Sequence, residues 1–129
     1  MAKPALYTMP MLYPVRISPN GKGGLRFTMP KLIRSQKGWE HEDIYIAYPR
    51  DERKLIIQHF KEYHDDAQVK VKKHYEPLIY NLYCVKGRDQ MLFELPVKIC
   101  QYFDWLKERL LVVVDEELDY VVLRKITQI

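Results

Sequence analysis

Cysteine, metal-binding motifs and long apolar runs are scarce in this sequence, and their scarcity excludes several classes of protein. Only two cysteines occur among 129 residues, Cys84 and Cys100, and they lack metal-ligand spacing. We predict two buried thiols rather than a disulfide or a metal site. No apolar stretch approaches the roughly 20 residues that cross a bilayer, and the N-terminus has no run typical of a signal peptide. We therefore expect a folded cytoplasmic protein without a membrane partner.

Catalytic and nucleotide-binding patterns are also missing. No nucleophile with a paired base and an orienting carboxylate can be picked out, so we expect no enzyme, no small-molecule substrate and no cofactor. The segment NGKGG at 20–24 lacks the following Gly-Lys-Ser/Thr of a nucleotide-binding loop, and it is typical of a hairpin turn. The four histidines include no pair at zinc-finger spacing beside cysteines, which favours surface or structural roles.

Acidic residues are absent from the first 39 positions, although the whole chain carries a formal charge of only +4. The cations of this acid-free stretch are Lys3, Arg16, Lys22, Arg26, Lys31, Arg34 and Lys37. From residue 67 onward, basic and acidic residues nearly cancel. Uncompensated positive charge favours a polyanionic partner, but a merely solvated basic surface would have the same composition.

What the chain has in abundance is internal similarity. Setting Pro30 against Pro96 without gaps pairs identical residues: Phe27 with Phe93, Ile33 with Ile99, Trp39 with Trp105 and Glu42 with Glu108. Apolar positions keep the same register, as in Ile57 and Leu123. We infer a tandem duplication of a unit of about fifty residues. Such a unit is small for independent folding, so the two should pack together or with a second chain.

The pattern of apolar and turn residues in each unit predicts two strands, a short helix and two further strands. The whole chain is therefore expected to be a mainly β protein with the plan ββαββ-ββαββ. Pro30 suits the first position of a helix over 30–37, and Gly38 can close that helix in the left-handed conformation. Trp39 and Trp105 are expected to anchor the core. The stretch LLVVV at 110–114 is apolar on both strand faces, so both faces should be covered.

The expected organisation has four parts. An extended arm at 1–11 precedes a first repeat at 12–60, a connector at 61–76 and a second repeat at 77–129. The first repeat should open with a hairpin of two alternating strands, near 13–17 and 25–29. The connector has mixed charge and no clear apolar face, so its structure is left open.

The segment VRISPNGKGGLRFTMPKLIRSQKGWEHEDIYI, followed by RKLIIQ, resembles the AbrB/SpoVT family, which includes MazE-like proteins. The resemblance covers about 12–60 well and 78–126 more loosely. It implies a swapped-hairpin β-barrel in which two copies interleave their strands, either within one chain as a pseudo-dimer or between two chains as a homodimer. Most members are DNA-binding transcription regulators, and some are antitoxins.

The resemblance also implies how double-stranded DNA would be met. Arg26 matches the basic position of the second strand, Arg34 the helix arginine, and Arg16 the basic residue of the first strand. Lys22, Lys31 and Lys37 would be flanking phosphate contacts. The planar guanidinium of arginine can donate two hydrogen bonds to one phosphate or guanine, whereas the ammonium of lysine acts as a point charge.

The second repeat departs from this pattern where DNA would bind. Its residues at the positions of Arg26, Arg34, Thr28 and Lys31 are Leu92, Cys100, Glu94 and Val97. Asp104 replaces the helix-closing Gly38 and accepts the left-handed conformation less readily. We therefore expect the second repeat to keep the fold without the DNA surface, and to serve in pairing.

Three functions follow from these observations. The first is a small DNA-binding transcription regulator that uses the first repeat. The second, from a different class, is an interaction or assembly module that uses the barrel for dimerisation. A MazE-like antitoxin comes third, because antitoxins of this kind need a toxin-wrapping tail and this chain ends at Ile129, just after a predicted strand.

Overall fold

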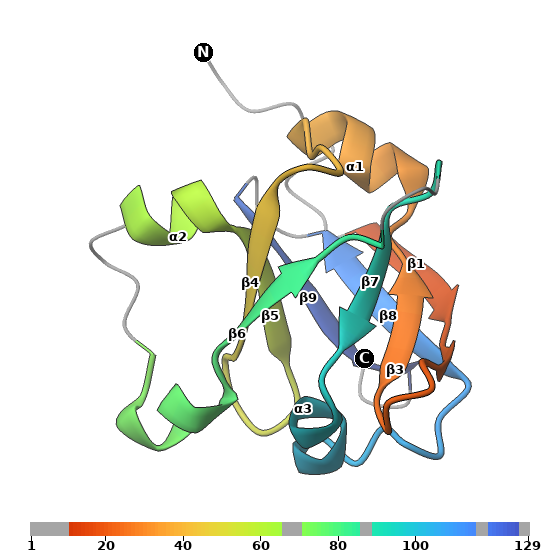
Figure 1. The fold of residues 1–129 in the computed structure, drawn as a ribbon, viewed down its shortest axis with the longest axis vertical. Coiled ribbons are helices and arrows are strands. Elements are labelled where there is room, and N and C mark those ends of the chain that lie inside the picture. Colours follow the sequence, from red (N-terminus) through yellow and green to blue (C-terminus); the bar gives the residue numbers. More distant parts are fainter. Residues whose placement is uncertain (1–10, 66–70, 86–88, 116–118, 127–129) are drawn as a thin grey trace.

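The computed structural model describes residues 11–65, 71–85, 89–115 and 119–126. The first repeat forms β1 (Met11–Arg16), β2 (Ser18–Pro19), β3 (Leu25–Thr28), α1 (Lys31–Lys37), β4 (Ile44–Pro49) and β5 (Leu55–His59). The second repeat forms β6 (Tyr80–Tyr83), β7 (Leu92–Leu95), α3 (Val97–Tyr102), β8 (Leu110–Asp115) and β9 (Tyr120–Lys125). Between them lie α2 (Phe60–Asp65) and the 3-10 helix η2 (Lys73–Leu78). The second repeat thus follows the ββαββ plan, and the first follows it with the short strand β2 added before β3 (Figure 1).

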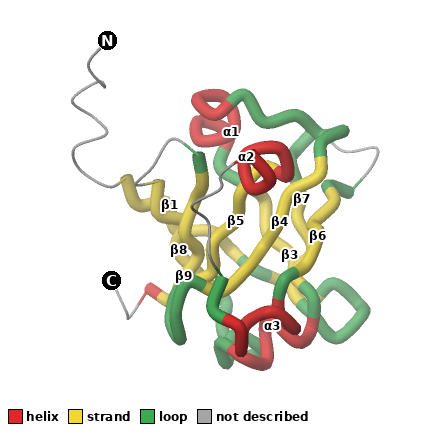
Figure 2. Tube along the Cα trace, turned by 90° about the vertical axis from the view of Figure 1, so that its left-hand side faces the viewer, coloured by secondary structure: helices red, strands yellow, loops and turns green. Residues whose placement is uncertain are grey.

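The strands form two antiparallel sheets. One has six strands in the order β1-β8-β9-β5-β4-β6, and the other has three in the order β2-β3-β7. The strands occupy the centre of the molecule, with α1 and α2 at one end and α3 at the opposite end (Figure 2). A mainly β fold with short helices is confirmed. A closed barrel is not: between β6 and β7 the described residues form a single bridge, Cys84 to Phe93, instead of a continuous ladder.

The register of the strands pairs equivalent residues of the two repeats. Phe27 of β3 lies opposite Phe93 of β7, and Ile56 of β5 lies opposite Val122 of β9. In each pair the two residues have the same place in the repeat. Such pairing is what an approximate twofold relation between the repeats requires.

Two further ladders also join strands of different repeats, whereas the ladders β2–β3, β4–β5 and β8–β9 each stay within one repeat. β1 of the first repeat pairs with β8 of the second, and β6 of the second pairs with β4 of the first. The expected opening hairpin is therefore largely wrong. β2 and β3 share only two residue pairs, while β1 runs along β8 for its whole length. Strand alternation predicts which side chains face inward, but it does not predict the neighbouring strand.

Apolar side chains cover both faces of the six-stranded sheet. Leu111 and Val113 of β8 belong to the main core, while Val112 and Val114 belong to a second cluster on the other face. The expectation that 110–114 is covered on both sides is thus confirmed. The connector supplies part of this cover, since Tyr63 of α2 packs on the second cluster. Because α2 packs on this cluster through one such aromatic, its sequence has no apolar stripe that would predict a packed helix.

The two short helices end alike. Gly38 has φ 67° and Asp104 has φ 58°, so both adopt the left-handed conformation predicted for them. The next amide in each repeat, that of Trp39 or Trp105, donates to a carbonyl of the helix, at 3.1 and 2.9 Å. Both tryptophans are buried, as predicted. Pro30 differs from expectation, because it is the cap residue before α1 instead of the first helical residue.

Two further expectations concern the ends of segments. Met11, assigned to the N-terminal arm, already belongs to β1, and the rest of the arm lies outside the described residues. Residues 86–90, the counterpart in the second repeat of the turn at 20–24, also lie partly outside them. In the part of the chain that is described, no helix has both the length and the apolar character needed to span a bilayer.

Candidate nucleic-acid interface

Three of the six predicted DNA contacts lie together. Arg16, Lys31 and Arg34 line a hollow of about 690 Å³, which we call the first hollow. It lies between β1, the start of α1 and residues 89–91 of the second repeat. Arg16 and Lys31 are exposed, and neither has an ion pair among the described residues. Their positive charges are therefore available to a ligand.

Arg34 is fixed at this hollow by three hydrogen bonds. Its guanidinium donates to the Asp89 carbonyl at 3.0 Å, to the Trp39 carbonyl at 3.4 Å and to Nδ1 of His41 at 3.0 Å. Because arginine has no acceptor, Nδ1 of His41 must accept, and Nε2 then donates to the Gln90 carbonyl at 3.0 Å. Of the five N–H groups of a guanidinium, these bonds leave two for a ligand.

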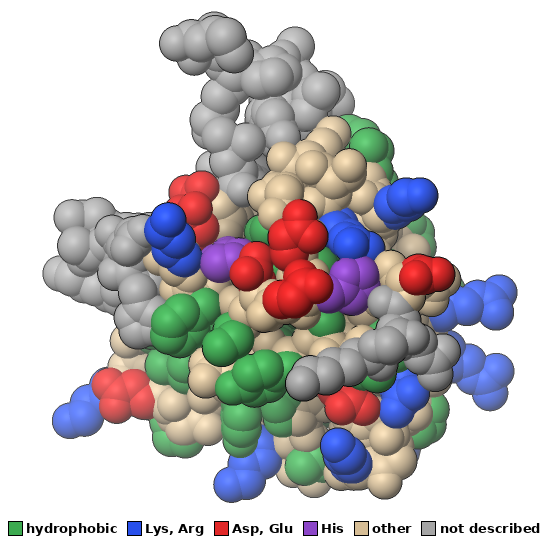
Figure 3. Space-filling model, turned by 45° about the horizontal axis from the view of Figure 1, so that its top comes forward, with side chains coloured by type: hydrophobic (Ala, Val, Ile, Leu, Met, Phe, Trp, Pro, Cys, Tyr) green, Lys and Arg blue, Asp and Glu red, His purple; other side chains and the backbone are tan. Residues whose placement is uncertain are grey.

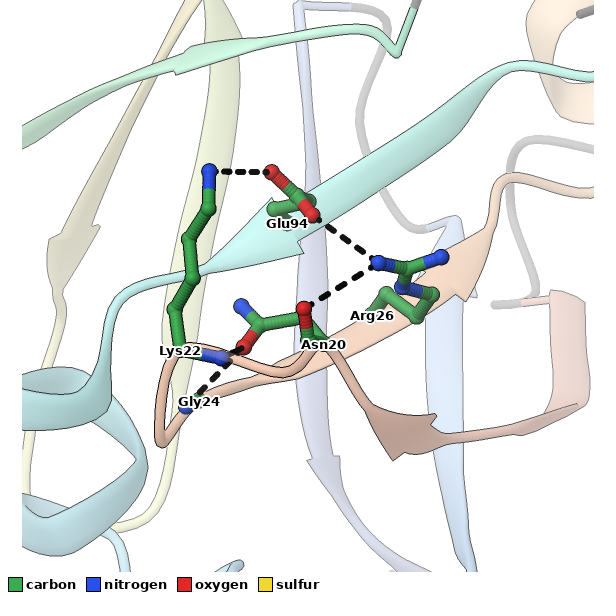
Figure 4. A network of polar contacts seen from close by, with 5 residues as sticks. All are labelled: Asn20, Lys22, Gly24, Arg26 and Glu94. Carbon is green, nitrogen blue, oxygen red and sulfur yellow. Dashed lines mark hydrogen bonds and ion pairs between the residues drawn. The ribbon is translucent and has the colours of Figure 1, made fainter.

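Lys22 and Arg26 lie elsewhere and face a carboxylate. Arg26 donates to Glu94 at 3.2 Å across the β3–β7 pair and to the Asn20 carbonyl at 3.2 Å, while Lys22 lies 3.8 Å from Glu94 (Figure 4). The sequence marks Glu94 as a departure from the DNA-binding pattern, but it does not place Glu94 opposite Arg26. Arg26 is therefore engaged within the chain instead of projecting freely toward DNA.

Lys37 must be removed from the predicted contacts. Its ammonium lies 2.7 Å from the Asp115 carboxylate, and the two side chains are only 2% and 1% exposed. A buried lysine at the end of α1 cannot reach a phosphate without leaving this ion pair. Its helical position is as predicted, but the side chain points inward because Asp115 ends β8 beside the helix.

The loop at 20–24 is a turn, as predicted, and three of its amides, those of Asn20, Lys22 and Gly24, donate within the turn. Oδ1 of Asn20 accepts hydrogen bonds from the amides of Lys22, at 2.8 Å, and Gly24, at 3.2 Å. A side chain at Gly24 would collide with the Leu95 carbonyl, and one at Gly23 would touch Val97. The loop thus packs against the start of α3.

The end of the molecule that carries α1 is not uniformly basic. Figure 3 shows acidic side chains at the centre of this end, between two histidines, with lysine and arginine around them. Of the acidic residues that follow α1 in the sequence, Glu40 and Glu42 are exposed and Asp43 pairs with His59 at 3.0 Å. Phosphate would therefore be repelled from the centre of this end and attracted to the side on which the first hollow opens.

The cysteines behave as buried thiols, as predicted. Burial raises the pKa of Cys84 and of Cys100 to about 11. Cys100 stands where the first repeat has Arg34, so the second repeat holds a neutral, buried group at this position. In α3, the position that corresponds to Arg34 is therefore part of the hydrophobic core.

Two cations that the family resemblance does not indicate also border Arg16. Lys107 and Arg109, in the segment before β8, line a second hollow of about 640 Å³ together with Arg16. In the sequence they stand beside Glu108 in a stretch of nearly balanced charge, which gives no signal of a binding surface. No family model, curated protein or solved structure matches this chain.

Proposed function

We propose that this chain is an AbrB-like DNA-binding transcription regulator that contacts duplex DNA through Arg16, Lys31 and Arg34. The observation that carries the proposal is the gathering of these three cations around the first hollow, without a carboxylate paired to any of them among the described residues. Lys22 and Arg26 have a smaller part, because Glu94 partly neutralises them, and Lys37 has none.

The proposal includes the swapped-hairpin barrel as the scaffold, formed within one chain. Its support is the strand exchange between the repeats and the register that sets Phe27 against Phe93. In this arrangement the second repeat takes the place of a second subunit. One chain then offers one basic face, because the second repeat has Val97 and Cys100 at the positions of Lys31 and Arg34.

The salt dependence of binding follows from the number of phosphates neutralised. Three contacts give a slope of about −2.7 in log K against log salt, so affinity would fall about 40-fold between 50 and 200 mM salt. Contacts of this kind carry no sequence information themselves, and they place the protein on the duplex.

The test is fluorescence anisotropy of a labelled random duplex titrated with the protein at 50 and 200 mM salt. Replacing both Arg16 and Lys31 with alanine should weaken binding at 50 mM by roughly a hundredfold or more, since two charge-assisted contacts of about 1.5–3 kcal/mol each are lost. The matched control replaces Lys72 and Lys73, two exposed lysines outside both hollows.

The control variant should bind within twofold of the unaltered protein. Equal affinity of the two double variants would refute this assignment of residues. If the unaltered protein fails to bind at 50 mM salt, DNA binding itself is wrong, and the assembly module becomes the better hypothesis.

A further inference from the structure

The second hollow adjoins the first at Arg16. Arg16 lines both, and in the β1–β8 ladder it pairs with Leu110, which lines the second hollow. The amide of Ile17 donates to the Arg109 carbonyl at 3.0 Å, which ties the segment before β8 to the end of β1. The exchange of strands between the repeats therefore sets a loop of the second repeat beside the basic strand of the first.

Lys107 and Arg109 are exposed, and within the described residues neither has an ion pair. The intervening Glu108 lies 3.9 Å from Lys125, so part of its negative charge is balanced on that side. Together with Arg16, these two side chains line the second hollow beside the exposed apolar side chains of Leu106 and Leu110.

The residues that correspond to Lys107 and Arg109 in the first repeat do not form a basic surface. His41 and Asp43 stand in the first repeat where Lys107 and Arg109 stand in the second. Both are engaged, His41 with Arg34 and Asp43 with His59. The approximate twofold relation therefore generates two composite faces, and only the face that contains Arg16 is basic.

We propose that Lys107 and Arg109 of the second repeat extend the DNA-binding surface beyond the first repeat. The surface then runs from Lys31 and Arg34 through Arg16 to Arg109 and Lys107, with phosphates as the groups recognised. This inference rests on the proposed function. It reverses the expectation that the second repeat contributes only to pairing.

The inference changes the expected salt dependence. Five phosphate contacts give a slope of about −4.5, so affinity falls about 500-fold between 50 and 200 mM salt, compared with about 40-fold for three. Replacing Lys107 and Arg109 together with alanine should return the slope to about −2.7. The same change should weaken binding at 50 mM at least tenfold.

The experiment compares this double variant with the unaltered protein, the Lys72/Lys73 control and the Arg16/Lys31 variant in the same anisotropy assay. Thermal melting of each variant checks that it is folded, and Lys107→Gln with Arg109→Gln provides a second neutral pair if the alanine variant is unstable. Weaker binding and a shallower slope in the neutral variants, with the control unchanged, supports the inference.

Two negative results have different meanings. If the Arg16/Lys31 variant loses binding while the Lys107/Arg109 variants keep the affinity and slope of the unaltered protein, this inference is overturned and the proposed function stands. If the unaltered protein does not bind the duplex at 50 mM salt, both are overturned.

Discussion

Replacing Lys37 with methionine should destabilise the fold strongly, because it leaves the Asp115 carboxylate buried without the ammonium that now lies 2.7 Å from it. Both side chains are almost completely inaccessible to solvent, at 2% and 1% exposure. Breaking such a buried pair from one side costs about 3–5 kcal/mol. For a domain of this size, that loss lowers the melting temperature by roughly 10–20 °C.

Removing both charges should cost much less. A double variant, Lys37→Met with Asp115→Val, leaves no buried charge, and apolar replacements of buried ion pairs are often neutral or stabilising. The equivalent pair supports this expectation, since Phe103 of the second repeat and Pro49 of the first, which correspond to Lys37 and Asp115, are both apolar. The free energies of unfolding of the four proteins, measured by urea denaturation, form a double-mutant cycle. A loss below about 1 kcal/mol for Lys37→Met, or additive losses, would refute the reasoning.

Two other predictions concern the turn and the thiols. Gly24→Ala should lower the free energy of unfolding by about 1–3 kcal/mol, because the added methyl group would collide with the Leu95 carbonyl. Gly21→Ala lies in open space at φ 80° and should lower it by only about 1 kcal/mol. A larger loss for Gly21→Ala than for Gly24→Ala in urea denaturation would contradict the packing argument. Burial raises the pKa of Cys84 and Cys100 from 9.0 to about 11, so their stabilising contribution is complete below pH 9 and is lost as the pH rises through 11. The double Cys→Ala variant should therefore show a smaller loss of stability between pH 8 and 11 than the unaltered protein, and equal losses would exclude the thiols as the cause.

The parts of the structure that the sequence predicts well depend on local geometry. Pro30, Gly38 and Trp39 recur as Pro96, Asp104 and Trp105, and each triplet describes how a short helix begins, ends and is anchored. Proline and a left-handed residue restrict the backbone at their own positions, whatever the rest of the chain does. The same is true of the turn at 20–24, whose side-chain hydrogen bonds stay within five residues.

The parts that the sequence does not predict depend on strand partners. Arg26 meets Glu94 only because β3 pairs with β7, and Lys37 meets Asp115 only because β8 ends beside α1. Both pairings join different repeats, and the resemblance of each repeat to a family gives no information on which carboxylate its cations will face. The site predicted from one repeat therefore contained cations that the other repeat neutralises.

The pairing of β1 with β8 has a consequence for the order of folding. During synthesis β1 leaves the ribosome well before its partner strand β8, which belongs to the second repeat. The first repeat therefore cannot complete its sheet until β8 has emerged. Ladders that join such distant segments carry a large loop-closure cost before they form, which slows folding. Until then the apolar side chains of β1 need protection from other partners, so the newly made chain is most open to aggregation before its last hairpin arrives.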